Sequence, residues 1–445
     1  MLIDLCLISA LLATGHLLRA AIPWLSRYFI PTAMIAGIVG LVAGPGGYDL
    51  LPFSRNASGD PNLTSYPGVL ITLLFATLLM GHREGGSTRQ ALRASSTSFL
   101  FSMGSEFMQY GVTLCVGVAL ISYVFIGLPP EFLVMMPAGF AGGHGTAAAY
   151  ADALPNWAPA RSVGFTFATI GILAAVFGGL VLINLARRCG WVAAQKAHDP
   201  DVIADQASFV PPAFQGSLGR ATVNGIAFEP LTWHFALVFA VYGAAMAILP
   251  TLRELLPPKF VLPAFAVAML LGWLLQSLLN VARVGRYVDS QVINRIGSMM
   301  SDFLVAFGIA SINIQIVIDY AVPLVLFSLL GLVLSVTWLL LVAPRVYGKR
   351  WFEPGIFTYG WNVATIPFGV ALLRIVDKRS DSTVLADYGV AYIAIGPIEA
   401  LLYTIVLAAL ASGYMLPLGI ALVVIALAMI WVAVRRSRSD RSLPT

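Results

Sequence analysis

The sequence is built from apolar blocks that match the thickness of a lipid bilayer. Blocks of about 20 apolar residues recur along all 445 residues, and a helix of that length crosses a hydrocarbon core of about 30 Å. Charged residues make up only 11% of the chain, against roughly 25% in soluble proteins. The sequence therefore predicts an all-α polytopic membrane protein. The net charge is +5, and the basic residues lie in short loops between the apolar blocks. This placement indicates membrane topology and gives no reason to expect a nucleic-acid partner.

Eleven of the apolar segments are predicted to be membrane crossings. They lie near residues 2–22, 29–44, 67–81, 97–125, 162–186, 231–249, 260–280, 296–318, 321–343, 387–411 and 414–434. Two further segments, 130–153 and 354–373, are apolar but are interrupted by glycine, proline and polar residues. The longest polar stretch, 188–230, is predicted to link two halves of the chain.

The positions of lysine and arginine indicate how the two interrupted segments sit. If each enters the bilayer and returns on the same side, with the N-terminus outside, 22 of the 26 lysines and arginines face the cytoplasm. If both segments span fully, that number falls to 15. Because positive residues concentrate in cytoplasmic loops, the re-entrant or broken arrangement is favoured. It places the linker and the C-terminus in the cytoplasm.

This arrangement makes the two halves inverted copies of each other. Pro31 and Gly40 in the first half have the same spacing as Pro263 and Gly272 in the second, and three further elements follow each pair in the same order. Inverted repeats with broken helices are the architecture of many secondary transporters. We predict a first repeat over 1–187, a linker over 188–230, a second repeat over 231–411, and an extra helix with a basic tail over 412–445.

The sharpest motif is Gly142-Gly143-His144-Gly145-Thr146, in the first interrupted segment. Glycines at this density disfavour a straight helix, and irregular backbone at membrane depth is tolerated only inside protein or beside a water-filled cavity. A break exposes N–H groups at a half-helix N-terminus, where a carboxylate binds favourably. Thr146 adds a hydroxyl, and His144 a donor whose charge depends on pH. We interpret the motif as a solute site; a packing kink around a buried histidine is the alternative.

Asn362 and Thr365 hold the corresponding place in the second interrupted segment. Gly360 and Gly369 loosen the helix around them, and Pro367 removes a backbone donor. These residues are candidates for the second half of the solute site. An ordinary proline-kinked helix is the alternative.

Three acidic residues lie within apolar segments, where burying a charge is costly. They are Glu106, Asp302 and Glu399. Each is a candidate for binding the coupling ion, as a Na⁺ ligand or as a proton acceptor, and each has the alternative of a structural hydrogen-bonded carboxyl. The sequence contains no motif for ATP binding or for a familiar intramembrane hydrolase, so we expect no cofactor and no enzyme.

At these residues the chain resembles the sodium/glutamate symporter family of bacterial inner membranes. The specific match is Ala-Gly-Gly-His-Gly-Thr followed by three alanines, at Ala141 to Ala149. The similarity covers roughly residues 5–410 and includes Ile30-Pro31, Phe75-Ala76-Thr77, Met108-Gln109, Gly171, Gly178-Gly179 and Leu262-Pro263. It implies a sodium-coupled importer of an acidic amino acid, glutamate first, with two inverted repeats. It also implies a homodimer in which a core moves past a scaffold.

Some positions depart from the family pattern. Where the family has Gly-His-Cys-Gly-Phe-Gly in the second half, this chain has Tyr359-Gly360-Trp361-Asn362. Glu399 and Leu402 stand where the family has an aspartate and an asparagine, and Glu106 and Asp302 stand at positions that are uncharged in the family. These departures leave the exact solute and the coupling ion, Na⁺ or H⁺, open.

Ion-coupled import of a small anionic solute is the leading functional hypothesis. A carrier of the same fold for another organic anion, an exporter or a channel is the first alternative. An intramembrane enzyme that uses His144 is the second. Transport driven by a cation gradient distinguishes the importer from both.

Overall fold

Every regular element is a helix in the part of the chain that the computed structural model describes. This part is residues 2–441 without 29, 58, 60, 79, 81–88, 193–208, 210–214, 216, 227, 257–261 and 378–381. Its β pairing is limited to one isolated bridge between Arg55 and Pro61. Most of the predicted linker therefore lies outside the described residues.

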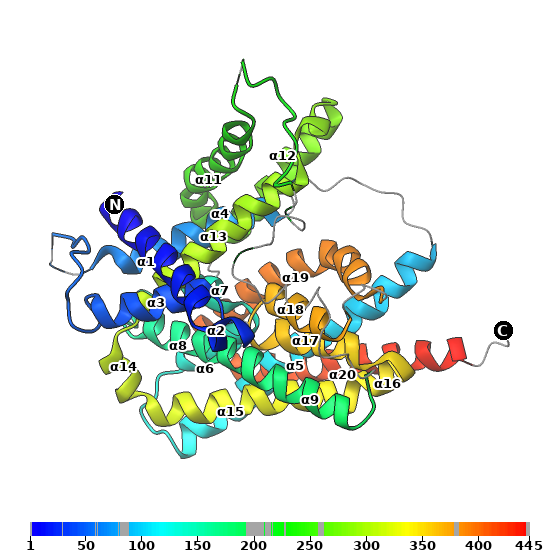
Figure 1. Ribbon diagram of the computed structural model, residues 1–445. Helices are drawn as coiled ribbons and strands as arrows, with labels where there is room; N and C mark the ends of the chain where they lie inside the picture. Colours follow the sequence, from blue (N-terminus) through cyan, green and yellow to red (C-terminus); the bar gives the residue numbers. More distant parts are fainter. Residues whose placement is uncertain are drawn as a thin grey trace.

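Within the described residues, the first half of the chain contains nine α-helices and the second half ten; Figure 1 shows how they are arranged. Those of the first half are α1 (Leu2–Ala21), α2 (Pro23–Arg27), α3 (Thr32–Ala43), α4 (Tyr66–Leu78), α5 (Arg89–Tyr123), α6 (Phe132–Ala141), α7 (Gly143–Ala153), α8 (Ala160–Leu173) and α9 (Gly179–Arg188). Those of the second half are α11 (Pro230–Leu255), α12 (Ala264–Val281), α13 (Ser290–Ala310), α14 (Ile314–Asp319), α15 (Ala321–Thr337), α16 (Ala343–Tyr347), α17 (Phe352–Val363), α18 (Ile366–Val376), α19 (Val384–Ser412) and α20 (Met415–Arg441).

Nine of the described helical segments are long and apolar enough to cross a bilayer. They correspond to nine of the eleven predicted crossings, so the polytopic membrane character is confirmed. The crossings predicted at 29–44 and 67–81 correspond to shorter helices, α3 with 12 residues and α4 with 13. At 1.5 Å per residue α3 is about 18 Å long, well short of a core of about 30 Å. The predicted count of about eleven crossings is therefore not confirmed within the described residues.

The crossing predicted at 296–318 is wrong at both ends because polar caps set its boundaries. Asp289 caps α13, and its Oδ1 accepts hydrogen bonds from the backbone N–H groups of Gln291 and Val292 at 3.0 and 3.1 Å. Asn313 caps α14 in the same way. These caps satisfy N–H groups that have no partner within the helix. Apolar residues recur at Ile312, Ile314 and Ile316, but α13 ends at Ala310.

Both interrupted segments consist of two helices that fold back on each other. In the second, Gly360 of α17 lies against Gly369 of α18, and the two are equally far from the turn at Ala364 and Thr365. In the first, Gly164 of α8 lies against both Met135 of α6 and Ala147 of α7. The predicted breaks are therefore present, and each one is the tip of a helical hairpin.

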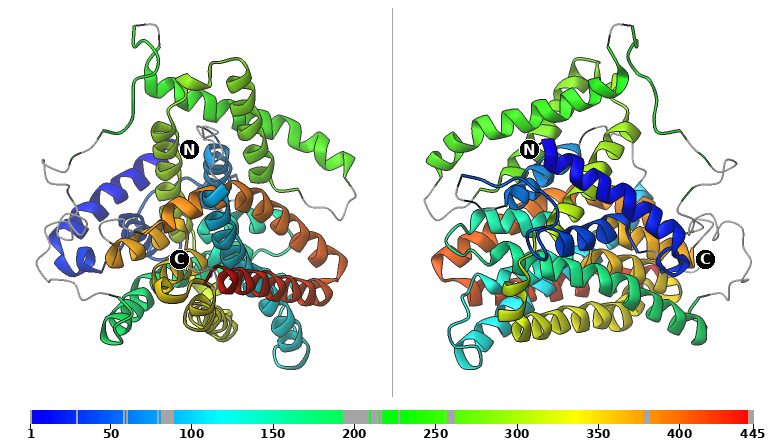
Figure 2. Two further views of the ribbon diagram at one scale, coloured as in Figure 1. Left: turned by 90° about the vertical axis from the view of Figure 1, so that its right-hand side faces the viewer. Right: turned by 60° about the vertical axis from the view of Figure 1, so that its left-hand side comes forward.

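The helices group into two bundles (Figures 1 and 2). The first bundle consists of α1, α3, α4, α11, α12 and α13, and the second contains α5 to α9 and α15 to α20. In the second bundle α20 lies along α5. The two hairpins both belong to the second bundle.

Packing inside the first bundle is reciprocal between the two halves of the chain. The helices α3 and α12 each begin directly after a proline, Pro31 or Pro263. Gly40 of α3 lies against α13, where an added Cβ would be 2.9 Å from the Cβ of Ala310, and Gly272 of α12 lies against α4. Small residues let membrane helices approach closely. Each proline-initiated helix thus packs on the helix that follows its counterpart.

Candidate functional site

The tips of the two hairpins meet, although they lie far apart in the sequence. Gly143 adopts a φ of +64°, a left-handed conformation that glycine tolerates and L side chains avoid. A Cβ at this glycine would lie 2.7 Å from the Cγ2 atom of Thr365. Thr365 is itself extended, with φ −163° and ψ 169°, and it immediately precedes α18. The tips of the two interrupted segments are therefore in contact, and Gly143 and Thr365 are the residues that meet.

The start of α7 presents unpaired backbone donors at this contact. Because α7 begins at Gly143, its first N–H groups have no acceptor within the helix. No carbonyl elsewhere in the described chain accepts from Gly143, His144 or Gly145; the next donor, the N–H of Thr146, reaches the carbonyl of Gly142 at 3.4 Å. The side chain of Thr146 also fills the space that a Cβ on Gly142 would need. A glycine is required there for the turn to close.

The His144 side chain is 2% exposed, and its hydrogen bonding fixes which ring nitrogen carries a proton. Its Nε2 atom lies 3.2 Å from Oγ1 of Thr169, and that hydroxyl already donates to the carbonyl of Phe165 at 2.7 Å. The hydroxyl has a single proton, so Nε2 of His144 donates to it. Nδ1 has no partner in the described part of the chain. In the neutral ring Nδ1 is therefore a free acceptor.

The first bundle forms the opposite wall of the site. Gly145 lies against Ile71 of α4 and Leu304 of α13, and the ring of His144 lies against Gly308 of α13. The residues of the predicted solute site are therefore enclosed between the two bundles, and Thr146 is only 1% exposed.

Asn362 does not join the other predicted solute residues. Its Nδ2 donates to Oγ of Ser335 on α15 at 3.3 Å, and its Oδ1 has no partner in the described part of the chain. The residue is 2% exposed. Asn362 thus lies close in sequence to the tip of the second hairpin, but its side chain points toward α15.

The three predicted ion-coupling acids separate into a pair and a single residue. Glu106 of α5 and Glu399 of α19 are 0% and 5% exposed, and the hydroxyl of Tyr403 donates to Oε1 of Glu106 at 3.3 Å. Asp302 of α13 lies on the exposed surface of the chain. It contacts neither glutamate among the described residues.

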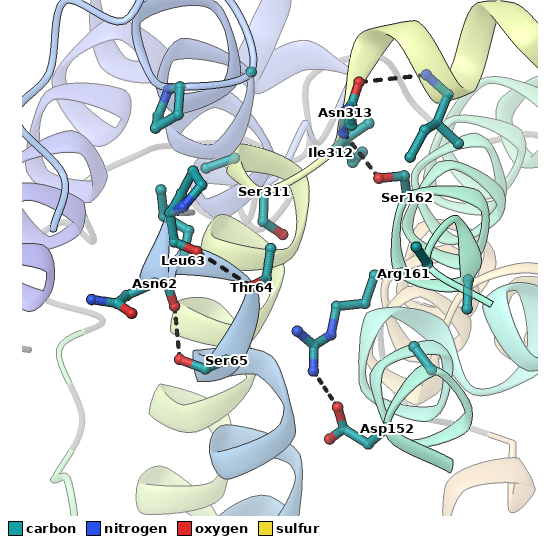
Figure 3. Close-up of a pocket in the computed structure, with 18 of the residues that line it drawn as sticks. Asn62, Leu63, Thr64, Ser65, Asp152, Arg161, Ser162, Ser311, Ile312 and Asn313 are labelled. Carbon is teal, nitrogen blue, oxygen red and sulfur yellow. Dashed lines mark hydrogen bonds and ion pairs between the residues drawn. The ribbon is translucent and has the colours of Figure 1, made fainter. Parts of the chain in front are cut away.

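A cavity of about 820 Å³, lined by both polar and apolar residues, opens between the bundles at the far end of α7 (Figure 3). Arg161 and Ser162 of α8 and Asp152 of α7 line one side, and Asn62 and Thr64 line the other. The Arg161 guanidinium pairs with Asp152 through Nη2, while its buried Nε has no partner in the described part of the chain. Asp152 lies nine residues from Gly143, or about 13 Å along the helix. The open cavity and the enclosed break thus lie at opposite ends of α7.

Sequence reasoning did not predict a role for Asp152 or Arg161. Arg161 is one of only four basic residues that the predicted topology leaves outside. The sequence signal that could have indicated a role for Arg161 is its position on the side of the membrane where few basic residues lie. Its pairing with Asp152 could not be predicted from the sequence, because the non-helical turn between α7 and α8 brings the two residues together.

Comparison with known proteins gives one family. The model of the sodium/glutamate symporter family matches residues 86–371, more than half of the chain. The match covers the first hairpin, the tip of the second as far as residue 371, Glu106, Asp302 and Arg161, and it stops before Glu399. A search of curated proteins finds no match.

Proposed function

The chain belongs to the sodium/glutamate symporter family, and on this premise we propose that it imports a small anionic amino acid, glutamate first, together with Na⁺. Members of such a family are carriers, not enzymes. The membrane is proposed to be the bacterial inner membrane, with the N-terminus outside and the C-terminus inside.

The observation that carries this proposal is the meeting of the two hairpin tips at Gly143 and Thr365. Irregular backbone at membrane depth needs partners for its polar groups, and the start of α7 has N–H groups without them. A carboxylate at these donors gains charge-assisted hydrogen bonds of roughly 1.5–3 kcal/mol each and about 0.3–2 kcal/mol from the helix dipole. A carboxylate of the solute is therefore proposed to bind at Gly143, His144 and Gly145.

The same site offers an acceptor for the other end of an amino acid. Nδ1 of His144 is buried and has no partner in the described part of the chain. An α-ammonium group has three donors and no acceptor capacity, which complements this nitrogen. Donors for a carboxylate beside an acceptor for an ammonium favour an amino acid over a simple organic anion.

The cavity at Arg161 is proposed to be the entrance to this site. In the proposed topology it opens on the outside, where an importer collects its solute. The guanidinium of Arg161 is suited to bidentate recognition of a carboxylate. Transport would then require the second bundle to move against the first, so that the solute passes from the cavity end of α7 to the break. Two inverted repeats and a homodimer complete the proposal, and the reciprocal packing of α3 on α13 and α12 on α4 supports the repeats.

Uptake into proteoliposomes tests the proposed function. An inward Na⁺ gradient should drive saturable accumulation of radiolabelled L-glutamate above the level reached without a gradient. A channel would conduct without saturation, and an enzyme would consume the solute in detergent with no gradient. Uptake that ignores every imposed cation gradient would exclude a coupled importer.

Cysteine labelling tests the proposed topology. In a background with Cys6, Cys115 and Cys189 replaced, an impermeant maleimide added to intact cells should not label Ser217→Cys in the linker. It should label Ala57→Cys, an exposed position on the predicted outer side. The predicted cytoplasmic loop at 82–96 and the tail should behave like Ser217. Labelling of Ser217→Cys from outside would contradict the inverted repeats.

A further inference from the structure

Glu106 and Glu399 are both buried inside the second bundle, on the helices α5 and α19, which pack against each other. They lie near the middles of α5 and α19, the two longest helices that the structure describes. Tyr403 lies four residues after Glu399, on the same face of α19, and its hydroxyl bonds to Glu106. The two carboxyls are close enough to interact electrostatically. They form a buried acid pair.

Among the described residues, the side chains that interact electrostatically with the pair are tyrosines, and none of them is basic. Those that interact electrostatically with one or both glutamates are Tyr110 of α5, Tyr150 of α7, and Tyr388, Tyr392 and Tyr403 of α19. The neighbouring helices α6, α12 and α15 carry no titratable side chain. Several charged or titratable side chains on the described parts of α7, α8, α16, α17 and α20 have partners other than the acid pair. These contacts are His144 with Thr169, Asp152 with Arg161, Arg345 with Leu341, Tyr347 with Ser98, Tyr359 with Ala174, Arg435 with Trp431, and Arg436 with Ser96. Glu353 of α17 adds a further acid, not a base.

A row of unsatisfied polar atoms extends from the pair along one face of α5. Oε2 of Glu106, both polar atoms of the Gln109 side chain and the hydroxyl of Thr113 have no partner in the described part of the chain. Gln109 and Thr113 are 1% and 0% exposed. Spacings of three and seven residues place them on the same helix face as Glu106. A buried polar atom without a partner is destabilising, so this face is suited to a ligand that it can hydrogen-bond.

We infer that Glu106 and Glu399 form one proton-binding site and that the proton bound there travels with the solute. Two carboxylates that share a buried site repel each other, and both cannot stay charged without a cation. A proton bound to one carboxyl removes this repulsion and supplies a donor for the other. The inference rests on the proposed transport function and adds a proton to Na⁺ as a second coupling ion. Glu106 lies within the residues that match the family, and Glu399 lies beyond them.

The geometry favours a proton over a metal ion. Hard cations are held by several oxygens at about 2.3–2.6 Å. The free oxygens of Glu106 and Thr113 are seven residues apart, about 10 Å along the helix, so they cannot ligate one ion together. No group of three or more acidic, histidine or cysteine side chains in the described chain is suited to a metal. A proton needs one oxygen and hydrogen-bonding neighbours, which the tyrosines provide.

Transport with an imposed proton gradient tests the coupling. At a fixed inward Na⁺ gradient, an added inward proton gradient should raise L-glutamate accumulation by the unaltered protein. Glu106→Gln and Glu399→Gln should each reduce this proton-driven increase at least tenfold while retaining exchange of external for internal glutamate, since exchange needs no net proton movement. Asp387→Asn, on the same helix as Glu399, should behave like the unaltered protein. The inference is overturned if either glutamine variant keeps the full proton-driven increase, or if a variant loses only its response to the Na⁺ gradient.

Infrared spectroscopy tests the site without transport. The purified, solute-free protein at neutral pH should show a carbonyl stretch of a buried protonated carboxyl. It should weaken in Glu106→Gln or Glu399→Gln, vanish in the double variant and persist in Asp387→Asn. Absence of this band in a protein that takes up glutamate would refute the proton site and leave the proposed function intact. The band in a protein that transports no glutamate would support the site and refute that function. Monodisperse elution in detergent verifies that the variants are folded.

Discussion

Replacing Gly143 by alanine should raise the apparent Kd for L-glutamate by about tenfold or more. An L residue at φ +64° costs about 1–2 kcal/mol, and the new methyl would lie 2.7 Å from Cγ2 of Thr365. Either the hairpin tips must separate, or the turn between α6 and α7 at Gly142 and Gly143 must change its conformation. Both changes displace the N–H groups that are proposed to hold the carboxylate. Binding to detergent-purified protein provides the measurement.

Two further variants separate the contact from the backbone effect. Gly413→Ala introduces a side chain at a similar φ of +76°, where nothing lies within 4 Å, and should leave binding unchanged. Thr365→Ser removes the contacting methyl and should restore part of the binding lost in Gly143→Ala. Normal glutamate binding by a folded Gly143→Ala protein would reduce the meeting of the tips to ordinary packing.

Replacing Arg161 by glutamine should raise the KM for glutamate uptake roughly ten- to hundredfold with a smaller change in kcat. The change removes charge-assisted hydrogen bonds worth about 1.5–3 kcal/mol at the proposed entrance while leaving the break intact. Initial rates of uptake over a range of glutamate concentrations in proteoliposomes measure both constants. The opposite split, a loss of kcat at constant KM, would contradict a role in capturing the solute.

The partner of Arg161 provides the sharper control. Asp152→Asn leaves the guanidinium in place and removes the competing carboxylate, so KM should fall or stay constant. If the ion pair served only to join α7 to α8, both variants would impair uptake similarly. Arg253→Gln removes another arginine from the predicted outer side, one that bonds to the carbonyl of Leu262, and should leave KM unchanged.

The position of the break explains how a site can be formed from a sequence with few charges. The donors proposed for the solute are backbone groups of Gly143, His144 and Gly145, which carry no formal charge and so cost little to bury when empty. The charged groups are kept apart from them. Arg161 lies in the open cavity, and the acid pair lies deeper in the second bundle.

Local patterns in the sequence were sufficient for the class of fold and for the breaks. The lengths of the apolar segments predicted all nine of the described helices that are long enough to span a membrane. This works because a helix that crosses a bilayer needs about 20 consecutive apolar residues. The glycines at 142, 143 and 145 predicted a break because they act through their own backbone freedom. The Gly-Gly-His-Gly-Thr motif likewise indicated the family that the comparison supports. Helix ends at Asp289 and Asn313 were missed because side-chain caps, not hydropathy, set them.

Contacts between distant segments were decided only by the tertiary structure. The sequence proposed both interrupted segments as halves of one site, but it could not show that Gly143 touches Thr365 or that Asn362 turns toward Ser335. It named three acids separately, and the packing of α19 on α5 joined two of them and left Asp302 on the surface. Hydropathy and helical periodicity describe which face of a helix avoids water or lipid. Which helix covers that face depends on shape and small-residue contacts across the whole chain, and no local window of sequence contains them.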